Sequence, residues 1–174
     1  MKKMIIVFAL AAFLTGCKAG GELETVMDTP VVPNQAEKME ILISLPENAA
    51  SNVMTSEETG TVFFCDDYIL TMQTTLSGDM HKTITETTGY AYGRLPIMET
   101  VQDSAKRYDC VWAAVGESGD QVGRCAILDD GNYHYILTVM ADAEKAGELT
   151  ESLWNDVFSS FQIVKPDDAI NSGS

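Results

Sequence analysis

The stretch that decides the fold is residues 107–142, RYDCVWAAVGESGDQVGRCAILDDGNYHYILTVMAD. It holds three runs rich in β-branched and aromatic residues, at 107–115, 121–129 and 132–141. Turn-type residues at 117–120 separate the first two runs, and Asp130-Gly131 separates the last two. Because both positions of an Asp-Gly pair tolerate positive φ, this dipeptide favours a type I′ hairpin. The stretch therefore predicts a three-stranded antiparallel meander.

The turns also predict a register. A two-residue loop at 130–131 pairs Asp129 with Asn132, and therefore Cys125 with Ile136, while the looser first turn places Cys110 opposite or diagonal to Cys125. One sheet face then carries Tyr108, Cys110, Trp112, Cys125, Ile127, His134, Ile136 and Met140. The other carries Val111, Val115, Val122, Ala126, Leu128, Tyr135, Leu137 and Val139. Because both faces are largely apolar, we expect both to be covered.

Upstream of the meander, residues 39–44, 60–66 and 68–76 read as strands, and residues 97–101 as a weaker one. Between them, Ser77 or Asp79 is placed to cap a short helix that runs to Thr88 and ends at Gly89. Downstream, residues 143–159 have helical periodicity, with Leu149, Leu153 and Val157 on one ridge. Residues 161–164 then read as a short closing strand before Pro166.

Together these patterns predict an α+β domain. We expect an antiparallel sheet of about six strands covered by helices, with a long C-terminal amphipathic helix before the closing strand. Because both sheet faces need cover, the expected arrangement is an α/β/α sandwich.

The N-terminus has the parts of an export signal. Lys2 and Lys3 precede an apolar run at 5–14, which is ten residues long, whereas a membrane-spanning helix needs about 20. The run ends in Leu14-Thr15-Gly16-Cys17. This ending resembles the lipobox of bacterial lipoproteins, in which the cysteine thiol receives diacylglycerol and becomes the first residue of the mature chain. The alternative is an ordinary secretory signal with a cysteine at that place by chance.

On this interpretation the chain divides into four parts. Residues 1–16 are the signal peptide, residues 17–36 the lipidated cysteine and a flexible tether, residues 37–165 a single domain, and residues 166–174 a disordered tail. Loss of Lys2 and Lys3 takes the net charge from −15 to about −17, with 9 basic and 26 acidic side chains left. Such a surface repels nucleic-acid phosphates, so we expect no nucleic-acid partner. The expected location is the cell membrane or outer membrane, on the extracytoplasmic side.

The order of elements also resembles a known fold. A meander, an amphipathic helix and a short strand entered through Phe158-Ser159-Ser160-Phe161 are similar to the PsbP/Mog1-like family, which includes some bacterial lipoproteins. This resemblance implies a three-layer α/β/α arrangement. It also implies a binding or assembly-accessory role rather than an enzymatic one, and it carries over no functional residue.

Three cysteines follow Cys17, so at most one intramolecular disulfide forms among them. Cys110 and Cys125 are the candidate pair, and the alternative is two buried, reduced thiols that pack as small hydrophobic side chains. Cys65 stands beside Asp66 and Asp67, whose charges raise a thiol pKa and oppose activation. We therefore expect Cys65 to be structural.

Other candidate residues favour structural roles. His134 lies mid-strand and predicts a satisfied core histidine, whereas His81, at the start of the short helix, is expected to be solvated. Asp129, Asp130 and Asn132 could offer oxygens to Ca²⁺, but the same residues are what a hairpin turn needs. The methionines that survive processing lie at core-like positions without clustering: Met39, Met54, Met72, Met80, Met98 and Met140.

No hydrolase, Walker A, HExxH or dinucleotide-binding motif occurs in the sequence. We therefore expect no catalytic residue, no metal site and no cofactor. The expected function is a cell-surface lipoprotein, bound to the membrane through its lipid, whose domain binds an unknown protein or small molecule. The alternative is a structural or assembly-accessory subunit of an envelope complex, with Tyr90, Tyr92 or Tyr133 as exposed anchors. An enzyme is the third and least favoured class.

Overall fold

The computed structural model describes residues 36–45, 53–56, 60–116, 119–147 and 151–166. All of them belong to one compact unit, Asn34–Ser174. The signal segment, Cys17, the tether, Leu149 and the tail beyond Pro166 lie outside the described residues, as do the side chains of Val115 and Leu153.

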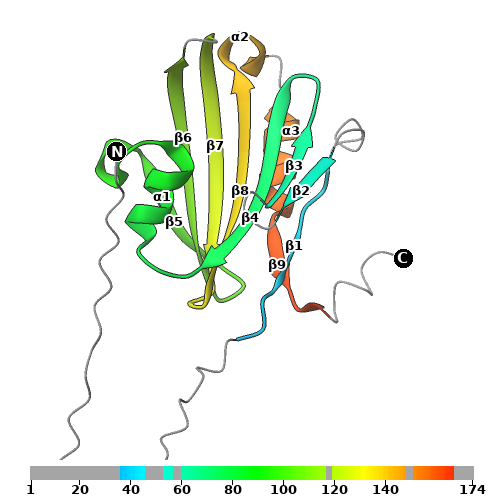
Figure 1. Ribbon diagram of the computed structural model, residues 1–174, viewed down its shortest axis with the longest axis vertical. Coiled ribbons are helices and arrows are strands. Elements are labelled where there is room, and N and C mark those ends of the chain that lie inside the picture. Colours follow the sequence, from blue (N-terminus) through cyan, green and yellow to red (C-terminus); the bar gives the residue numbers. More distant parts are fainter. Residues whose placement is uncertain (1–35, 46–52, 57–59, 117–118, 148–150, 167–174) are drawn as a thin grey trace, which may run out of the picture. The chain divides into compact units, whose positions relative to one another are not determined.

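A seven-stranded antiparallel sheet dominates the described residues, with its strands in the order β2-β3-β4-β8-β7-β6-β5 (Figure 1). Its strands are β2 (Val53–Ser56), β3 (Gly60–Phe64), β4 (Tyr68–Leu76), β5 (Ile97–Gln102), β6 (Ala105–Gly116), β7 (Gly119–Asp129) and β8 (Tyr133–Asp142). The predicted meander is thus confirmed as β6-β7-β8, which are neighbouring strands of this sheet.

A second, two-stranded sheet joins the two ends of the domain. Its strands are β1 (Glu40–Leu42) and β9 (Gln162–Val164), and they run antiparallel, with Glu40 opposite Val164. Both strands were expected from the sequence, but they pair with each other instead of extending the main sheet.

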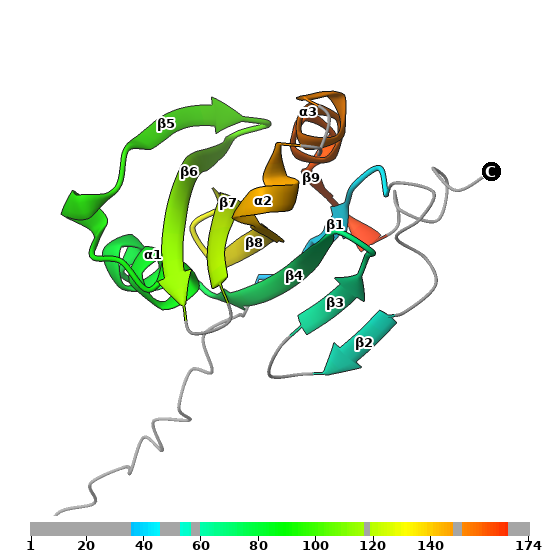
Figure 2. The same ribbon diagram turned by 90° about the horizontal axis from the view of Figure 1, so that it is seen from above.

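Helices cover parts of both sheet faces (Figure 2). On one side, α1 (Met80–Thr88) and the 3₁₀ turn η2 (Tyr92–Arg94) lie over a core that includes Ile84, Trp112 and Ile127. On the other side, α3 (Glu151–Ser160) inserts Val157 and Phe158 into a second core. The first core matches the face predicted to carry Tyr108, Cys110 and Trp112. The second holds most of the other predicted face: Ala126, Leu128, Tyr135, Leu137 and Val139.

Helix α1 forms where the sequence predicts it. The Asp79 carboxylate accepts a hydrogen bond from the backbone N–H of His81 at 2.9 Å, and this N-cap satisfies a donor that has no partner inside the helix. Gly89 ends the helix in the left-handed conformation, with φ of 78°. Both boundary residues are therefore local sequence signals that the structure confirms.

The predicted fold class, in contrast, is wrong. The domain is mostly β, and the described residues contain three short α-helices rather than continuous helical layers. The long C-terminal helix expected over 143–159 does not form: α2 (Ala143–Ala146) ends at Gly147, and α3 begins at Glu151. The extra β content comes from β2, which the sequence did not predict, and from β6 and β7, which are longer than predicted. An α/β/α sandwich therefore does not describe this domain.

The hairpin between β7 and β8 also differs from the prediction. Asp129 pairs with His134, not with Asn132, so the loop has four residues rather than two. Gly131 has a φ of 89°, but Asp130 has no positive φ, which rules out a type I′ turn. The error shifts the register by two residues, so Cys125 faces Thr138 instead of Ile136. Because a shift of two preserves strand parity, every described side chain of these strands stays on its predicted face.

Candidate functional site

A shallow groove lies on the face of β5, β6 and β7 that also carries α3. It has a volume of about 450 Å³. Its lining is Pro96, Ile97, Met98, Asp109, Cys110, Val111 and Arg124. Met98 and Val111 are 60% and 50% exposed, which is high for large apolar side chains. An apolar concavity with few polar groups is the usual form of a small-molecule site.

Arg124 is the charged group of this groove. Strand β7 places it directly opposite Val111, and its guanidinium lies 4.2 Å from the ring centre of Phe158 in α3. Its hydrogen bond is a long one of 3.4 Å, donated from Nη1 to the carbonyl of Trp154. Burial lowers the pKa of the Arg124 guanidinium, and the nearby charge of Asp109 opposes that change. Arginine nevertheless stays protonated in proteins, so the groove carries a positive charge.

The carboxylate of Asp109 is committed to another arginine. Arg107 donates to it through Nε at 2.7 Å and Nη2 at 2.9 Å, a bidentate pair on the same sheet face. Arg107 also donates to the carbonyl of Phe158 at the end of α3. Among the described residues, Arg124 itself forms no ion pair. The three side chains therefore leave one positive charge without a neutralising partner.

Cys110 also lines the groove, although its side chain lies with Cys125 in the core beneath α1, on the other face of the sheet. The two residues are paired across β6 and β7, and their Sγ atoms lie 2.7 Å apart with both thiols free. The hydrogen bond between the thiols, together with burial, raises the pKa of Cys125. The same hydrogen bond lowers the pKa of Cys110, so Cys110 is the thiol of the pair that ionises first.

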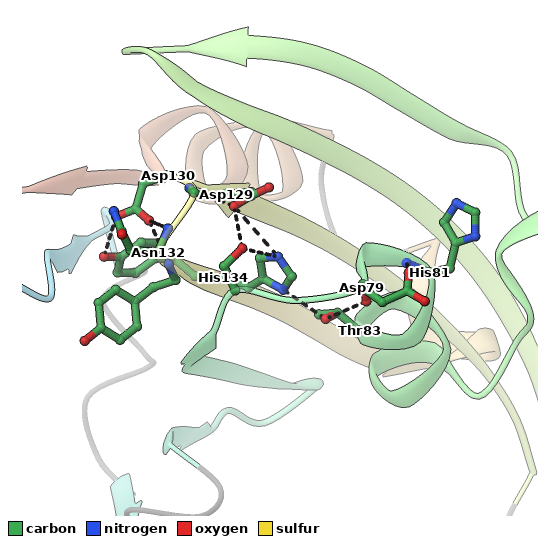
Figure 3. Close-up of polar contacts among 11 residues, drawn as sticks. Asp79, His81, Thr83, Asp129, Asp130, Asn132 and His134 are labelled. Atoms are coloured by element: carbon green, nitrogen blue, oxygen red, sulfur yellow. Dashed lines mark hydrogen bonds and ion pairs between the residues drawn. The ribbon is translucent and has the colours of Figure 1, made fainter. Parts of the chain in front are cut away.

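The predicted core histidine is the centre of a polar network (Figure 3). His134 is 0% exposed. Its Nδ1 lies 2.9 Å from the hydroxyl of Thr83 in α1, and its Nε2 lies 3.3 Å from the hydroxyl of Ser77. Ser77 in turn donates to Asp129 Oδ1 at 3.1 Å. Both ring nitrogens thus have partners, which confirms the interpretation of a satisfied core histidine.

A polar cavity of about 380 Å³ lies between α1 and β4, close to this network. Its lining includes Thr83, whose hydroxyl is the one that contacts His134, together with Asp79 and Lys82. Thr83 also makes a 3.4 Å hydrogen bond to the carbonyl of Asp79, as helical threonines commonly do. Its hydroxyl therefore serves the helix and the histidine, and nothing in this geometry activates it for chemistry.

The acidic residues of the β7–β8 hairpin are used by the turn itself. Asp129 Oδ1 accepts a hydrogen bond from the N–H of Gly131 at 2.9 Å. Asp130 Oδ1 accepts from the N–H groups of Asn132 and Tyr133, at 2.8 and 2.7 Å. The hydroxyl of Tyr135 donates to the second oxygen of Asp130. These contacts confirm turn chemistry as the role of these side chains.

The remaining candidates occupy ordinary positions. Cys65 is half-buried, and burial first, then the charge of Asp66, raises its pKa, as expected for a structural thiol. His81 is exposed and stacks on Tyr92 with ring centres 3.9 Å apart. Met39, Met72, Met80 and Met140 pack against the two cores. Core filling was the wrong expectation for Met54 and Met98, which are exposed.

The three tyrosines expected as anchors of the assembly-accessory alternative are all partly buried. Tyr90 donates to the carbonyl of Ala113 at 2.6 Å, and Tyr92 donates to Glu99 at 2.7 Å. Tyr133 packs against the core that contains Phe158. These contacts hold the rings within the domain and do not present them as one exposed patch.

Comparison with known proteins places the fold. No protein-family model and no curated protein matches the chain. Two solved structures are similar. Cyanobacterial PsbP (CyanoP) from Synechocystis sp. PCC 6803 has a TM-score of 0.51 at 10% identity, over 72% of this chain and 92% of that one. LpqN, involved in cell envelope biogenesis of Mycobacterium tuberculosis, has a TM-score of 0.52 at 9% identity, over 76% and 87%. The domain has a PsbP-like fold.

The predicted resemblance is therefore confirmed for the fold, although the three-layer arrangement drawn from it is not. Within the described ranges, no helix is long and apolar enough to cross a membrane.

Sequence reasoning missed Arg107, Asp109 and Arg124 as a group. A signal was nevertheless present. Arg124 shares strand parity with Val122 and Ala126, and Asp109 shares it with Val111, so all lie on a face assigned as apolar. A charged residue at such a position requires a buried partner or a ligand. Strand parity does not indicate that Asp109 pairs with Arg107, which leaves Arg124 without an ion pair among the described residues.

Proposed function

We propose that this chain is a lipid-anchored, extracytoplasmic protein that binds a small molecule or a partner through the groove and performs no catalysis. The observation that carries the binding role is the pairing of exposed apolar side chains, Met98 and Val111, with the unneutralised charge of Arg124 in one concavity. Binding sites concentrate apolar surface around a few polar groups in this way.

The proposed lipid anchor rests on the lipobox-like segment Leu14-Thr15-Gly16-Cys17. Residues 1–16 would be removed, lipid on Cys17 would hold the protein at the cell or outer membrane, and residues 17–36 would give residues 37–165 reach from that surface. Replacement of Cys17 by Ser should release the domain or leave an uncleaved precursor. Fractionation and mass measurement of the processed chain test this, and a variant that is processed and lipid-bound as before would contradict the anchor.

The binding role can be tested with two matched double variants. Met98→Ser with Val111→Ser removes the apolar lip of the groove, whereas Val101→Ser with Ile69→Ser removes exposed apolar surface away from it. All four side chains are substantially exposed, so both double variants should fold. We expect ligands from a small-molecule screen or a pull-down to lose affinity for the first variant only. Ligands that bind both variants equally would exclude the groove as the site.

The second candidate is an accessory role in assembly of an envelope complex. What favours it is the likeness in fold to LpqN, which is involved in cell envelope biogenesis. Tyr90, Tyr92 and Tyr133 make contacts within the domain, which argues against their use as the exposed anchors expected for that role. A pull-down that recovers a partner through the surface of β2, where Val53 and Met54 are exposed, would favour this candidate over the groove. The strongly acidic composition argues against a nucleic-acid partner in either case.

A further inference from the structure

The groove contains chemistry that selects among ligands. Pro96, Met98 and Val111 offer apolar contact, and Arg124 offers a guanidinium at the same concavity. This guanidinium is held by its stack on Phe158 and by the carbonyl of Trp154. Because an arginine presents five N–H donors in a planar fork, these two contacts leave donors free for an acidic group.

The local charge differs in sign from that of the whole chain. The chain carries a net charge of −15, yet Arg107, Asp109 and Arg124 together carry +1. Asp109 cannot neutralise Arg124 fully, because both of its oxygens already accept from Arg107. An anion that reaches the groove would therefore find an attractive guanidinium within a protein that otherwise repels anions.

We infer that the groove is a site for a small amphipathic anion, whose apolar chain lies along Met98 and Val111 and whose carboxylate or phosphate pairs with Arg124. This inference rests on the proposed binding function and names its ligand class. The volume of about 450 Å³ lies within the range of small-molecule sites, so one short chain would suffice to fill it.

Three probes of equal chain length test the sign of the charge: decanoate, decanol and decylammonium. Titration calorimetry on the full chain carrying Cys17→Ser, below the micelle concentration of each probe, should give decanoate the highest affinity. Charge-assisted hydrogen bonding predicts that decanoate binds about 10- to 100-fold more tightly than decanol. The net charge of the chain predicts the opposite, with decylammonium first, so the order is decisive.

Variants locate the effect. Arg124→Met keeps an unbranched side chain without the charge and should abolish the preference for decanoate over decanol. Arg94→Met makes the same change of charge on an exposed arginine of η2 and should preserve it. If Arg124→Met unfolds, Arg124→Lys keeps the charge but loses the planar fork, and it should reduce the preference only in part.

Each outcome separates the two proposals. Equal affinity for decanoate and decanol, both lost in Met98→Ser with Val111→Ser, would overturn the anionic ligand and retain the binding groove. Tightest binding of decylammonium would overturn the anionic ligand as well. Failure of all three probes to bind would remove both this ligand class and the main support for the groove as a small-molecule site.

Discussion

At the scale of the residue, Gly123 decides how Trp112 packs. The two are paired across β6 and β7, and the indole ring lies directly over the glycine backbone. A Cβ atom at position 123 would meet Cε2 and Cζ2 of Trp112, and also the sulfur of Met140, well inside contact distance. A backbone without a side chain is therefore what lets the tryptophan fill this core.

Gly123→Ala should destabilise the domain by about 1–3 kcal/mol, because the rigid indole must move to admit a methyl group. The fitting control is Gly78→Ala, since a Cβ at position 78 meets nothing within 4 Å. Urea unfolding followed by tryptophan fluorescence measures both. Equal midpoints for the two variants would show that Trp112 does not pack as described.

The buried imidazole of His134 gives the stability a pH dependence. Burial, the largest effect, lowers its pKa below the ordinary value of 6.5, although the charges of Asp129 and Asp130 oppose this. Below about pH 6.5 the unfolded chain therefore binds a proton that the folded one resists. Stability should fall as the pH drops from about 7 to 5.5, by at most about 1.4 kcal/mol per pH unit from this residue.

Unfolding midpoints at pH 7.5, 6.5 and 5.5 isolate this effect. His134→Gln should flatten the pH dependence relative to the unsubstituted chain, whereas His81→Gln, at an exposed site, should leave it unchanged. All three proteins contain the same carboxylates, so the comparison with His81→Gln is the control for their contribution. Parallel curves for His134→Gln and His81→Gln would contradict the assignment.

Cys110 and Cys125 should form a disulfide where the compartment is oxidising. Formation removes a proton and an electron from each thiol, and a disulfide-bearing oxidant takes up the electrons. Because the sulfur atoms already face each other across the strands, the backbone need not rearrange. Peptide mapping without reductant should recover the two cysteines as one linked species and Cys65 as a free thiol. Free thiols at both Cys110 and Cys125 in protein isolated from an oxidising compartment would refute this.

At the scale of the element, hairpins show how far a sequence predicts a sheet. Strand parity, read from the predicted turns, correctly assigned the two faces of β6, β7 and β8, because parity survives an even register shift. It did not give the loop length at Asp130-Gly131, where the side chain of Asp130 organises a wider turn by accepting two backbone N–H groups. Turn geometry thus depended on a side-chain contact that dipeptide preference does not include.

The tight turn with two positive φ angles lies elsewhere, between β5 and β6. Asp103 and Ser104 have φ of 48° and 72° and join Gln102 to Ala105. Neither residue is a glycine, so this turn is less stable than it could be. Ser104→Gly should stabilise the domain by about 1 kcal/mol. The measurement is the melting temperature, which should rise relative to that of the unsubstituted chain.

The converse substitution supplies the control for that turn. Gly131→Ser places a side chain at a φ of 89° and should lower the melting temperature. If both substitutions shifted it in the same direction, backbone conformation would not be the cause.

At the scale of the whole molecule, pairing over long distances was beyond prediction. The strands at 40–42 and 162–164 were recognisable by composition, but nothing in the residues indicated that they would leave the main sheet and pair with each other. The groove has the same origin. It exists because β5 becomes the edge next to β6, which leaves Met98 beside Val111 without a covering layer. Local propensity carries no information about which strand becomes an edge.

Deletion of residues 162–174 should destabilise the whole domain, because it removes the partner of β1. Ile41 and Ile163 pack together against the core that contains Phe161, so their separation exposes apolar surface. Deletion of residues 167–174 alone spares β9 and should leave the melting temperature unchanged. Comparison of the two truncated chains by calorimetry tests this, and equal stability would show that the β1–β9 pair contributes nothing.

The pairing of Glu40 with Val164 also sets when the β1–β9 sheet can form during synthesis of the chain. Strand β1 has no partner until almost the entire chain has been synthesised, so the sheet that it forms with β9 is among the last contacts available during biogenesis. The strands of the seven-stranded sheet, in contrast, can all pair with one another before β9 is made, so the β1–β9 pair closes the domain last.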